Sequence, residues 1–343
     1  FGEKLATPDT SIADLIGEVD PIKVAEGRYL SDELTLHYGL VPRTNRGIFA
    51  INELPDLAER IQVGLLNVLE ERDVQIRGYK IRLPLDVMLV ASANPDDYTN
   101  RGRIITPLKD RFGSQIRTHY PLEVATEVAI IEQESRPASI GDVEVVVPDF
   151  MKEVIATFSH LARQSNHISQ RSGVSVRLSV SNYEIMCANA VRRALRAGET
   201  NVAPRVSDLE ALAASTSGKV EIESLEEGRE GAILEQIVKA AVLQVYKRLA
   251  TPATVHIDKV NEILAAFESG TLAHAGEDIT SAQLVQLLSD IPALKSVVEV
   301  FVGANATPAV QASGVEFVLE GLHLSKRLNK DASGVRATYR AKA

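Results

Sequence analysis

The chain has 343 residues, of which 45% are hydrophobic and 24% charged, as in ordinary globular proteins. A formal net charge of -9 and a pI near 5.4 argue against nucleic acid and anionic membranes as partners of the whole chain. The single cysteine, Cys187, excludes an internal disulfide, and no run reaches the roughly 18 apolar residues that a membrane span needs. We expect two or three domains and a cytoplasmic location.

The first expected elements are a short helix and a buried strand. Asp9 or Thr10 is placed to cap a helix over 12–16. The chain is then loop-like, with residues 38–42 extended. Next, the four apolar residues of 48–51 do not alternate with polar ones, which favours a strand buried on both faces in a parallel sheet covered by helices.

Further elements complete an α/β domain. Apolar residues at helical spacing predict an amphipathic helix over 58–69. A β-hairpin is expected over 74–83, because its apolar residues alternate on either side of a turn. A second buried strand is expected at 87–91 and a third, short strand at 115–118. The α/β domain therefore spans residues 1–120.

After residue 120 the pattern becomes helical. We expect an all-helical lid over 121–270 and a C-terminal helical extension over 271–343, frayed from Asn329 onward. Cys187 is expected to be a buried, inert thiol, and the basic cluster Arg192–Arg196 a solvated helix face. The expected helices are 123–134, 149–165, 175–197, 206–215, 231–249, 256–267, 279–288, 293–302 and 309–328.

Polar side chains follow two of the predicted strands. Asn52 and Glu53 come directly after the first, and Ser92 and Asn94 after the second. Ligands of open α/β sheets bind at the carboxyl ends of the strands, where a carboxylate can take a proton from water and an amide can hold that water or a phosphate. The alternative is that Asn52 and Glu53 only open a loop and cap the next helix.

Two arginines could add positive charge to such a site. Arg111 lies on a loop that follows the second strand, and a cation there can stabilise a phosphoryl transition state. Ser175 is a plausible N-cap, which places Arg177 in the first helical turn, where the helix macrodipole disfavours a cation unless it faces an anion. The alternative for Arg177 is a solvated surface side chain. The seven histidines form no close helical pair, so no metal held by protein ligands is expected from them.

These segments together resemble the AAA+ ATPases. Within that superfamily the chain resembles the magnesium chelatase ATPase subunit, with the MoxR group as near relatives. The motifs are Gly47–Glu53, similar to a Walker B strand; Ser92–Pro95, similar to sensor 1; Leu108–Gly113, similar to an arginine-finger segment; Ser175–Arg177, similar to sensor 2; and the hairpin over 74–83, similar to a pre-sensor-1 hairpin.

The resemblance implies a role for each residue. Glu53 would polarise the attacking water, Asn94 would contact the γ-phosphate or that water, and Arg177 would sense the nucleotide from the lid. Arg111 would reach into a neighbouring subunit's site, which implies a homo-oligomeric ring, a hexamer. ATP and Mg²⁺ are the implied cofactors, and a protein with an integrin-like domain is the implied partner.

The sequence departs from the family pattern at two places. Asn52 stands where the family has a magnesium-associated Asp; it keeps an oxygen ligand but lacks one negative charge, so Mg²⁺, reached through water, should be held weakly and hydrolysis should be slow. No glycine-rich phosphate loop precedes the Walker B-like strand. We therefore expect the chain to start after that loop and these residues alone to bind ATP poorly.

Three classes of function fit. The first is an ATPase subunit that remodels a protein partner, as in chelatase or MoxR systems. The second is a ring scaffold or regulatory subunit. In that case Asn52, in place of the family's Asp, would indicate that hydrolysis is weakened. The third is an activator of the sigma-54 type; neither a Gly-Ala-Phe-Thr-Gly-Ala loop nor a C-terminal helix-turn-helix with a basic recognition helix is found for it.

Overall fold

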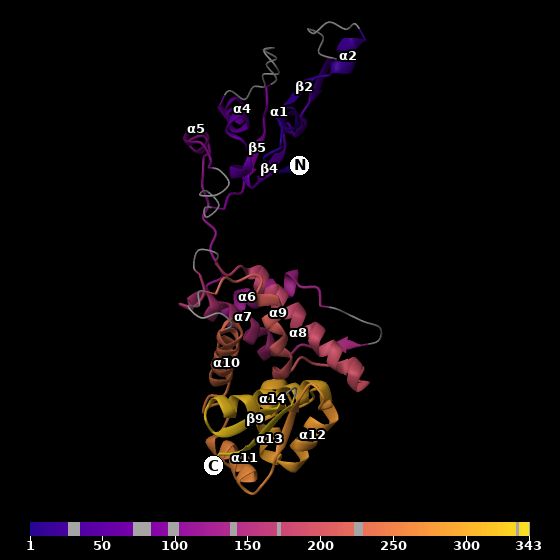
Figure 1. Cartoon of the computed structure of the whole chain (residues 1–343), viewed down its shortest axis with the longest axis vertical. Helices are drawn as coiled ribbons and strands as arrows, with labels where there is room; N and C mark the ends of the chain where they lie inside the picture. The colour runs from indigo at the N-terminus through magenta and orange to yellow at the C-terminus, as the bar shows by residue number, and fades with distance from the viewer. Residues whose placement is uncertain are drawn as a thin grey trace. The chain divides into compact units, whose positions relative to one another are not determined.

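The computed structural model describes residues 1–26, 35–70, 84–94, 103–137, 143–169, 173–222, 229–333 and 336–342. They form two compact units, Phe1–Thr118 and His119–Ala343 (Figure 1). None of the described helices combines the length and apolar character needed to cross a membrane.

The first unit is built on a three-stranded parallel sheet. Its order is β1 (Gly2–Leu5), β4 (Ile48–Asn52) and β5 (Met88–Ala91), with β4 in the centre. Leu5 pairs with Asn52, and Ile51 pairs with Ala91, so the carboxyl ends of all three strands lie at one edge. The predicted α/β fold class with a parallel sheet is confirmed.

Only one face of this sheet is covered by described residues. Phe49 and Ile51 are 0% and 1% exposed and share a hydrophobic cluster with Ile61 and Leu65 of α4 (Glu59–Glu70). Ile48 on the opposite face is 44% exposed. The prediction of strands buried on both faces is therefore wrong for the described residues, because side chains alternate across a strand and no described helix covers the Ile48 face.

The other elements of the first unit differ from the sequence predictions in two ways. Ser11, rather than Asp9 or Thr10, caps α1, and its hydroxyl accepts a hydrogen bond from the Asp14 N–H at 3.1 Å. Residues 40–42, predicted extended, belong to a helical turn. The remaining elements are α1 (Ile12–Leu15), β2 (Gly17–Val19) paired antiparallel with β3 (Leu36–Tyr38), α2 (Pro21–Ala25), α3 (Leu40–Arg43), η2 (Leu54–Asp56) and α5 (Thr106–Lys109).

The predicted strand at 115–118 does not form. This stretch is exposed, with Ile116 at 87%, and no described strand lies beside it to complete its hydrogen bonds. The predicted hairpin over 74–83 lies outside the described residues.

The second unit is mostly helical, as predicted. A short parallel pair, β6 (Glu144–Val145) and β7 (Asn201–Val202), lies among the helices. The helices are α6 (Val124–Glu134), α7 (Asp149–Gln164), α8 (Val176–Ala197), η4 (Val206–Ala211), α9 (Leu212–Thr216), α10 (Glu230–Leu249), α11 (Ile257–Glu268), α12 (Ser281–Asp290), α13 (Pro292–Val302) and α14 (Pro308–Leu324).

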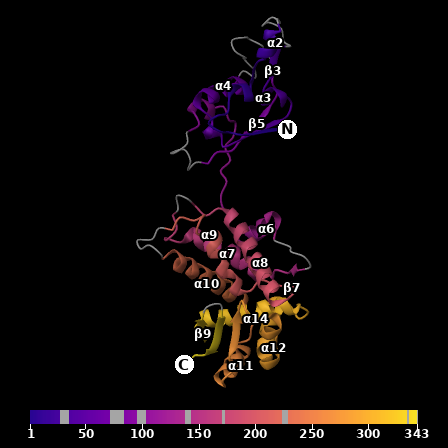
Figure 2. The same ribbon diagram turned by 45° about the vertical axis from the view of Figure 1, so that its right-hand side comes forward.

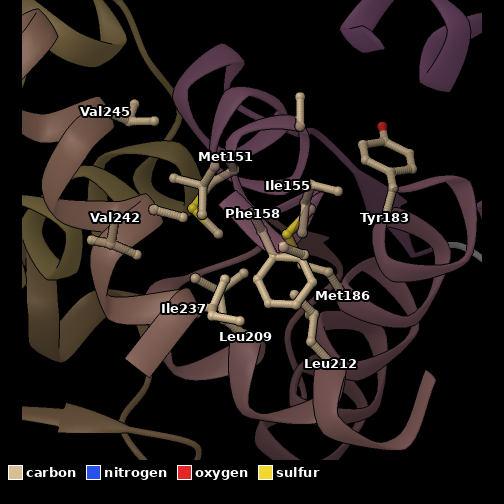
Figure 3. Close-up of a cluster of buried hydrophobic side chains, with 14 of the residues drawn as sticks. Met151, Ile155, Phe158, Tyr183, Met186, Leu209, Leu212, Ile237, Val242 and Val245 are labelled. Carbon is tan, nitrogen blue, oxygen red and sulfur yellow. The ribbon is translucent and has the colours of Figure 1, made fainter. Parts of the chain in front are cut away.

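Two hydrophobic cores hold this unit together. The first lies among α7, α8, η4, α9 and α10 and includes Met151, Phe158 and Met186 (Figure 3). The second lies among α11 to α14 and the C-terminal strands and includes Phe267 and Leu294.

The C-terminal tail is a sheet, so the predictions of an all-helical extension and of a frayed end from Asn329 are wrong. β9 (Leu328–Ser333) and β10 (Arg336–Ala341) pair antiparallel, and β10 also pairs with β8 (Ala273–Gly276). β9 packs against α14 (Figure 2). Leu328 and Tyr339, each 2% exposed, anchor the hairpin in the second core. The partner strand lies about sixty residues away in sequence, which local pattern does not reveal.

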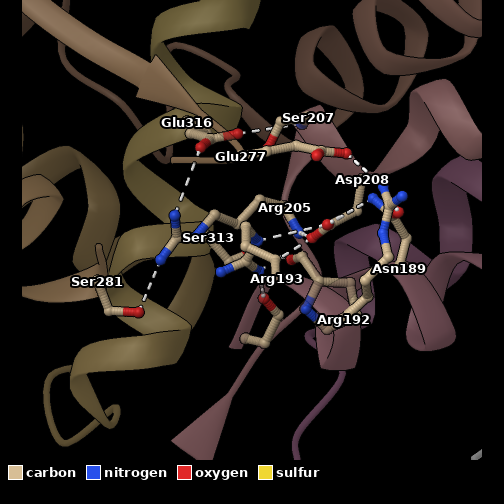
Figure 4. A network of polar contacts seen from close by, with 12 residues as sticks. Asn189, Arg192, Arg193, Arg205, Ser207, Asp208, Glu277, Ser281, Ser313 and Glu316 are labelled. Carbon is tan, nitrogen blue, oxygen red and sulfur yellow. Dashed lines mark hydrogen bonds and ion pairs between the residues drawn. The ribbon is translucent and has the colours of Figure 1, made fainter. Parts of the chain in front are cut away.

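The prediction that the basic cluster Arg192–Arg196 forms a solvated helix face is wrong for Arg193, which is buried. Its Nη2 donates to Asp208 Oδ2 at 3.0 Å, and both residues are at most 2% exposed (Figure 4). Arg205, fully buried nearby, donates to the Ile279 carbonyl at 2.6 Å and to Ser281 Oγ at 2.7 Å. This ion-pair network joins α8 and the loop before η4 to the start of α12.

Alkaline pH should destabilise the second unit. Burial raises the pKa of Cys187, Tyr183 and Tyr246 to about 12, from ordinary values of 9.0, 10.0 and 10.0. Their stabilising contribution is complete below pH 9 and is lost as pH rises toward 12, because the unfolded chain releases these protons first. From about 1.4 kcal/mol per pKa unit, the loss at pH 11 is on the order of 5 kcal/mol.

Urea unfolding of the chain at pH 8, 9.5 and 11 measures this loss. A Cys187→Ala variant should lose less stability than the wild type between pH 8 and 9.5, where the thiol makes the largest contribution because its ordinary pKa is the lowest of the three. Equal losses in both proteins would contradict the assignment.

Candidate functional site

The predicted polar residues meet at the carboxyl edge of the parallel sheet. Ser92, directly after β5, donates through Oγ to Asn52 Oδ1 at 3.0 Å and accepts from the Glu53 N–H at 3.2 Å. Its backbone N–H donates to the Ile51 carbonyl at 2.9 Å, and its carbonyl accepts from Leu54 at 3.0 Å. Ser92 thereby fixes the end of the central strand to that of its neighbour.

Glu53 has an unusual backbone conformation. Its φ of 55° and ψ of 49° place it in the left-handed region, which non-glycine residues seldom occupy and which costs on the order of 1–3 kcal/mol. The chain is held in this turn by the Ser92 contacts on one side and by Leu54, 1% exposed, on the other. Such strain persists where the surroundings enforce it and is frequent at functional sites. Glu53 does not cap the following turn, because its side chain accepts no capping hydrogen bond there.

The donor set at this edge suits a hard cation only in part. Asn52 and Ser92 offer neutral oxygens and Glu53 one carboxylate, the oxygen ligands that Mg²⁺ prefers, but with a single charge. Asn52 Oδ1 already accepts the Ser92 hydroxyl. Among the described residues no group of three or more His, Cys, Asp and Glu side chains could hold a metal ion by itself. This fits a cation held mainly by other groups and reached through water.

Asn94 and Arg111 also belong to the first unit. Asn94 is exposed two residues beyond Ser92. Arg111 donates through Nη2 and Nε to Glu70 Oε2, at 2.6 and 3.1 Å, and through Nη1 to the Pro107 carbonyl at 3.2 Å. Glu70 is the last residue of α4, so the predicted finger is held on the surface of its own subunit by an ion pair.

Gln62 is a structural residue that the sequence predictions missed. It is 1% exposed and lies on the apolar side of α4. Its amide donates to the carbonyls of Leu57 and Arg103, at 2.9 and 3.2 Å, and its Oε1 accepts from the Ile105 N–H at 2.9 Å. These bonds anchor the segment that leads to Arg111. The sequence does hint at this role, because Gln62 stands beside Ile61 within the apolar stripe of the helix.

Arg177 lies in the second unit, in the first turn of α8. Ser175 caps this helix as predicted and accepts from the Arg177 N–H at 3.2 Å. The Arg177 side chain is exposed. The structure thus brings Asn52, Glu53 and Ser92 into contact, whereas Arg177 belongs to a separate unit.

Comparison with protein families gives a match over part of the first unit. Residues 25–108 match the Sigma-54 interaction domain family, which supports an AAA+ ATPase type for the first unit. The matched range contains Asn52, Glu53 and Asn94 and ends before Arg111.

Individual proteins show more distant similarity. The acetoin dehydrogenase operon transcriptional activator AcoR of Bacillus subtilis is 29% identical over 115 residues, which are 33% of this chain and 18% of that protein. The chain therefore spans a small part of this relative. Among solved structures, NtrX of Brucella abortus shares 16% identity with a TM-score of 0.39, covering 72% of this chain and 53% of NtrX. A candidate ATPase of Cytophaga hutchinsonii shares 18% identity with a TM-score of 0.27, covering 69% of this chain and 76% of its own.

Proposed function

We propose that the chain is part of an AAA+ ATPase subunit that couples ATP hydrolysis to the remodelling of a protein partner. The observation that carries this is the constrained carboxylate Glu53, at the carboxyl end of the central parallel strand and hydrogen-bonded through its backbone to Ser92 of the neighbouring strand end. The family match over residues 25–108 supports the same reading.

In this proposal Glu53 accepts a proton from the water that attacks the γ-phosphate. Asn94, two residues past the neighbouring strand, contacts the phosphate or that water. Asn52 faces Mg²⁺ through water, and the ion supplies the charge that neutralises the phosphate oxygens. Arg177 senses the nucleotide from a helical lid over 121–270.

The finer assignment follows the resemblance of the sequence motifs. We place the chain with the magnesium chelatase ATPase subunit and MoxR chaperones, acting as a hexameric ring on a protein that carries an integrin-like domain. A scaffold or regulatory subunit with weak hydrolysis is the alternative that Asn52 favours. Measuring steady-state ATP turnover of the whole protein distinguishes these two.

A second candidate is a transcriptional activator of the sigma-54 type. It is favoured by the match to the Sigma-54 interaction domain and by the similarity to AcoR over 115 residues. Binding of the whole protein to sigma-54, measured in the presence of ATP and a transition-state analogue, supports this candidate if it is observed. Selective capture of an integrin-like-domain protein supports the first.

Arg111→Ala should abolish hydrolysis in a ring and inhibit wild-type subunits mixed with it. A finger acting in trans is worth about 10³–10⁵-fold in rate, so each variant subunit silences its neighbour's site. Mixing Arg111→Ala with Glu53→Gln subunits should restore part of the ATPase activity that each variant lacks alone, because a site with an intact Glu53 can then receive Arg111 from its neighbour. Glu70→Gln, which removes the ion-pair partner of Arg111 and leaves the arginine in place, should retain activity by itself. No activity in the mixture of the two variants would contradict action between subunits.

Asn52→Asp should raise the ATPase rate of the whole protein and lower the Mg²⁺ concentration needed for half-maximal activity. The substitution restores one negative charge beside the cation at nearly unchanged volume. The control is Asn52→Ala, which removes the oxygen and should not raise the rate. An unchanged rate and Mg²⁺ dependence in Asn52→Asp would contradict the proposal that residue 52 faces Mg²⁺.

A further inference from the structure

A cavity of about 480 Å³ lies in the second unit where its two hydrophobic cores adjoin. Phe158, Leu209 and Leu234 of the first core line it, as do Ala275 and Tyr339 of the second. Pockets that bind small organic ligands have volumes of about 300–1,000 Å³, are largely apolar and occur between domains. The cavity has the size and apolar lining of such a pocket, and nothing in the proposed nucleotide chemistry uses it.

The polar part of the lining carries an excess of carboxylates. Five glutamates contribute to it, against two lysines and one arginine. Arg336, the arginine, is itself paired with Asp278 outside the lining. Four of the five glutamates have a cation nearby: Glu235 has Lys239 at 2.5 Å, Glu277 has Arg192 at 2.6 Å, Glu320 has Lys330 at 2.8 Å, and Glu316 has Arg205 at 3.9 Å.

One carboxylate oxygen of Glu316 has no hydrogen-bond donor among the described residues. It is 2% exposed, and its Oε2 accepts from the Ser207 N–H at 3.1 Å. Its Oε1 is buried without a hydrogen-bond donor, and the Arg205 guanidinium lies 3.9 Å away, beyond hydrogen-bond reach. The Ser207 hydroxyl, which also lines the cavity, is buried and unpaired as well. A buried acceptor is costly to leave empty, so a donor in the cavity would be strongly favoured.

Glu210 is the remaining carboxylate of the lining. Its carboxylate forms no hydrogen bond or ion pair with the residues that the structure describes. Glu210 is exposed to solvent as a whole residue, but partial desolvation of its carboxylate raises its pKa, and the carboxylates of Glu277, Glu235 and Glu316 raise it further, against the opposing charge of Lys330. A bound cation would relieve this repulsion, whereas a bound anion would add to it.

We propose that this cavity binds a small organic ammonium ligand. Its apolar body packs against Phe158, Leu209 and Leu234, and its protonated amine donates hydrogen bonds to Glu316 Oε1 and faces Glu210. The site lies wholly within the second unit and does not depend on the nucleotide site.

Calorimetry of the 343-residue chain with 4-phenylbutylamine and 4-phenylbutyrate tests the class of ligand. The two probes share an apolar body and differ in the sign of their charge. The amine should bind with 1:1 stoichiometry and raise the Tm with increasing concentration, and the carboxylate should do neither. Equal binding of the two probes, or no binding of the amine, overturns the proposal.

Matched variants test the place of binding. Glu210→Gln should weaken amine binding about tenfold, the effect of losing one charge-assisted interaction. Glu268→Gln removes the same charge from an exposed residue of α11 outside the cavity lining, whose carboxylate has no partner among the described residues, and should leave binding unchanged. Since neither glutamate supports the fold through a hydrogen bond, both variants should keep the wild-type Tm without probe. Unchanged binding in Glu210→Gln, or an equal loss in both variants, overturns the site.

Discussion

Glu53→Gln in the whole protein should lower ATP turnover about 10²–10⁴-fold while nucleotide still binds, because the amide cannot accept a proton from water. The substitution keeps the size of the side chain, and the backbone contacts that hold this turn do not involve the carboxylate: Ser92 binds the Glu53 N–H, and Leu54 is buried. Loss of activity would therefore report chemistry and not local unfolding.

The measurement is single-turnover hydrolysis with nucleotide binding followed in parallel. Asp56→Asn is the matched control, since this acid lies three residues later in the 3₁₀ turn and the sequence assigns it no role. Turnover of Glu53→Gln within a factor of about three of wild type would exclude Glu53 as the base, because general base catalysis contributes far more than that.

Arg193→Met should destabilise the second unit by about 3–5 kcal/mol, because it leaves the carboxylate of Asp208 buried without its ion-pair partner. For a domain of this size such a loss lowers the Tm by roughly 10 °C. The neighbouring Arg192 provides a matched control on the same helix. It pairs with Glu277 at 2.6 Å, but its side chain is 52% exposed, so Arg192→Met should cost at most about 1 kcal/mol.

Thermal unfolding followed by circular dichroism compares the two variants directly. The double variant Arg193→Met, Asp208→Leu should recover part of the lost stability, because replacing both members of a buried pair removes the uncompensated charge. A similar, small cost for both single variants would show that Arg193 contributes no more than a surface arginine.

The helices and the parallel sheet could be predicted because their signals are local. Helical periodicity located α7 and α8 to within a residue or two, and Ser175 was recognised as the cap of α8. The meeting of Asn52, Glu53 and Ser92 followed from parallel strands having their carboxyl ends at one edge.

What could not be predicted depends on partners distant in sequence. The C-terminal hairpin owes its order to pairing between β10 and β8 and to the burial of Tyr339. Arg193 looks like its exposed neighbours until Asp208 is placed beside it. Likewise, no local pattern shows that Glu70 holds Arg111, because the two residues are 41 positions apart.

The length of α8 has a mechanical consequence. It is one continuous helix of 22 residues, about 33 Å at 1.5 Å per residue, that begins at the Ser175 cap and ends at Gly198 in the left-handed conformation. Arg177 is at one end, and at the other Arg193 is clamped to Asp208 next to Arg205, which reaches Ser281 at the start of α12. Because no proline or glycine interrupts α8, we expect a tilt imposed at the Arg177 end to displace the Arg193–Asp208 pair, and with it the start of α12, without bending of the helix.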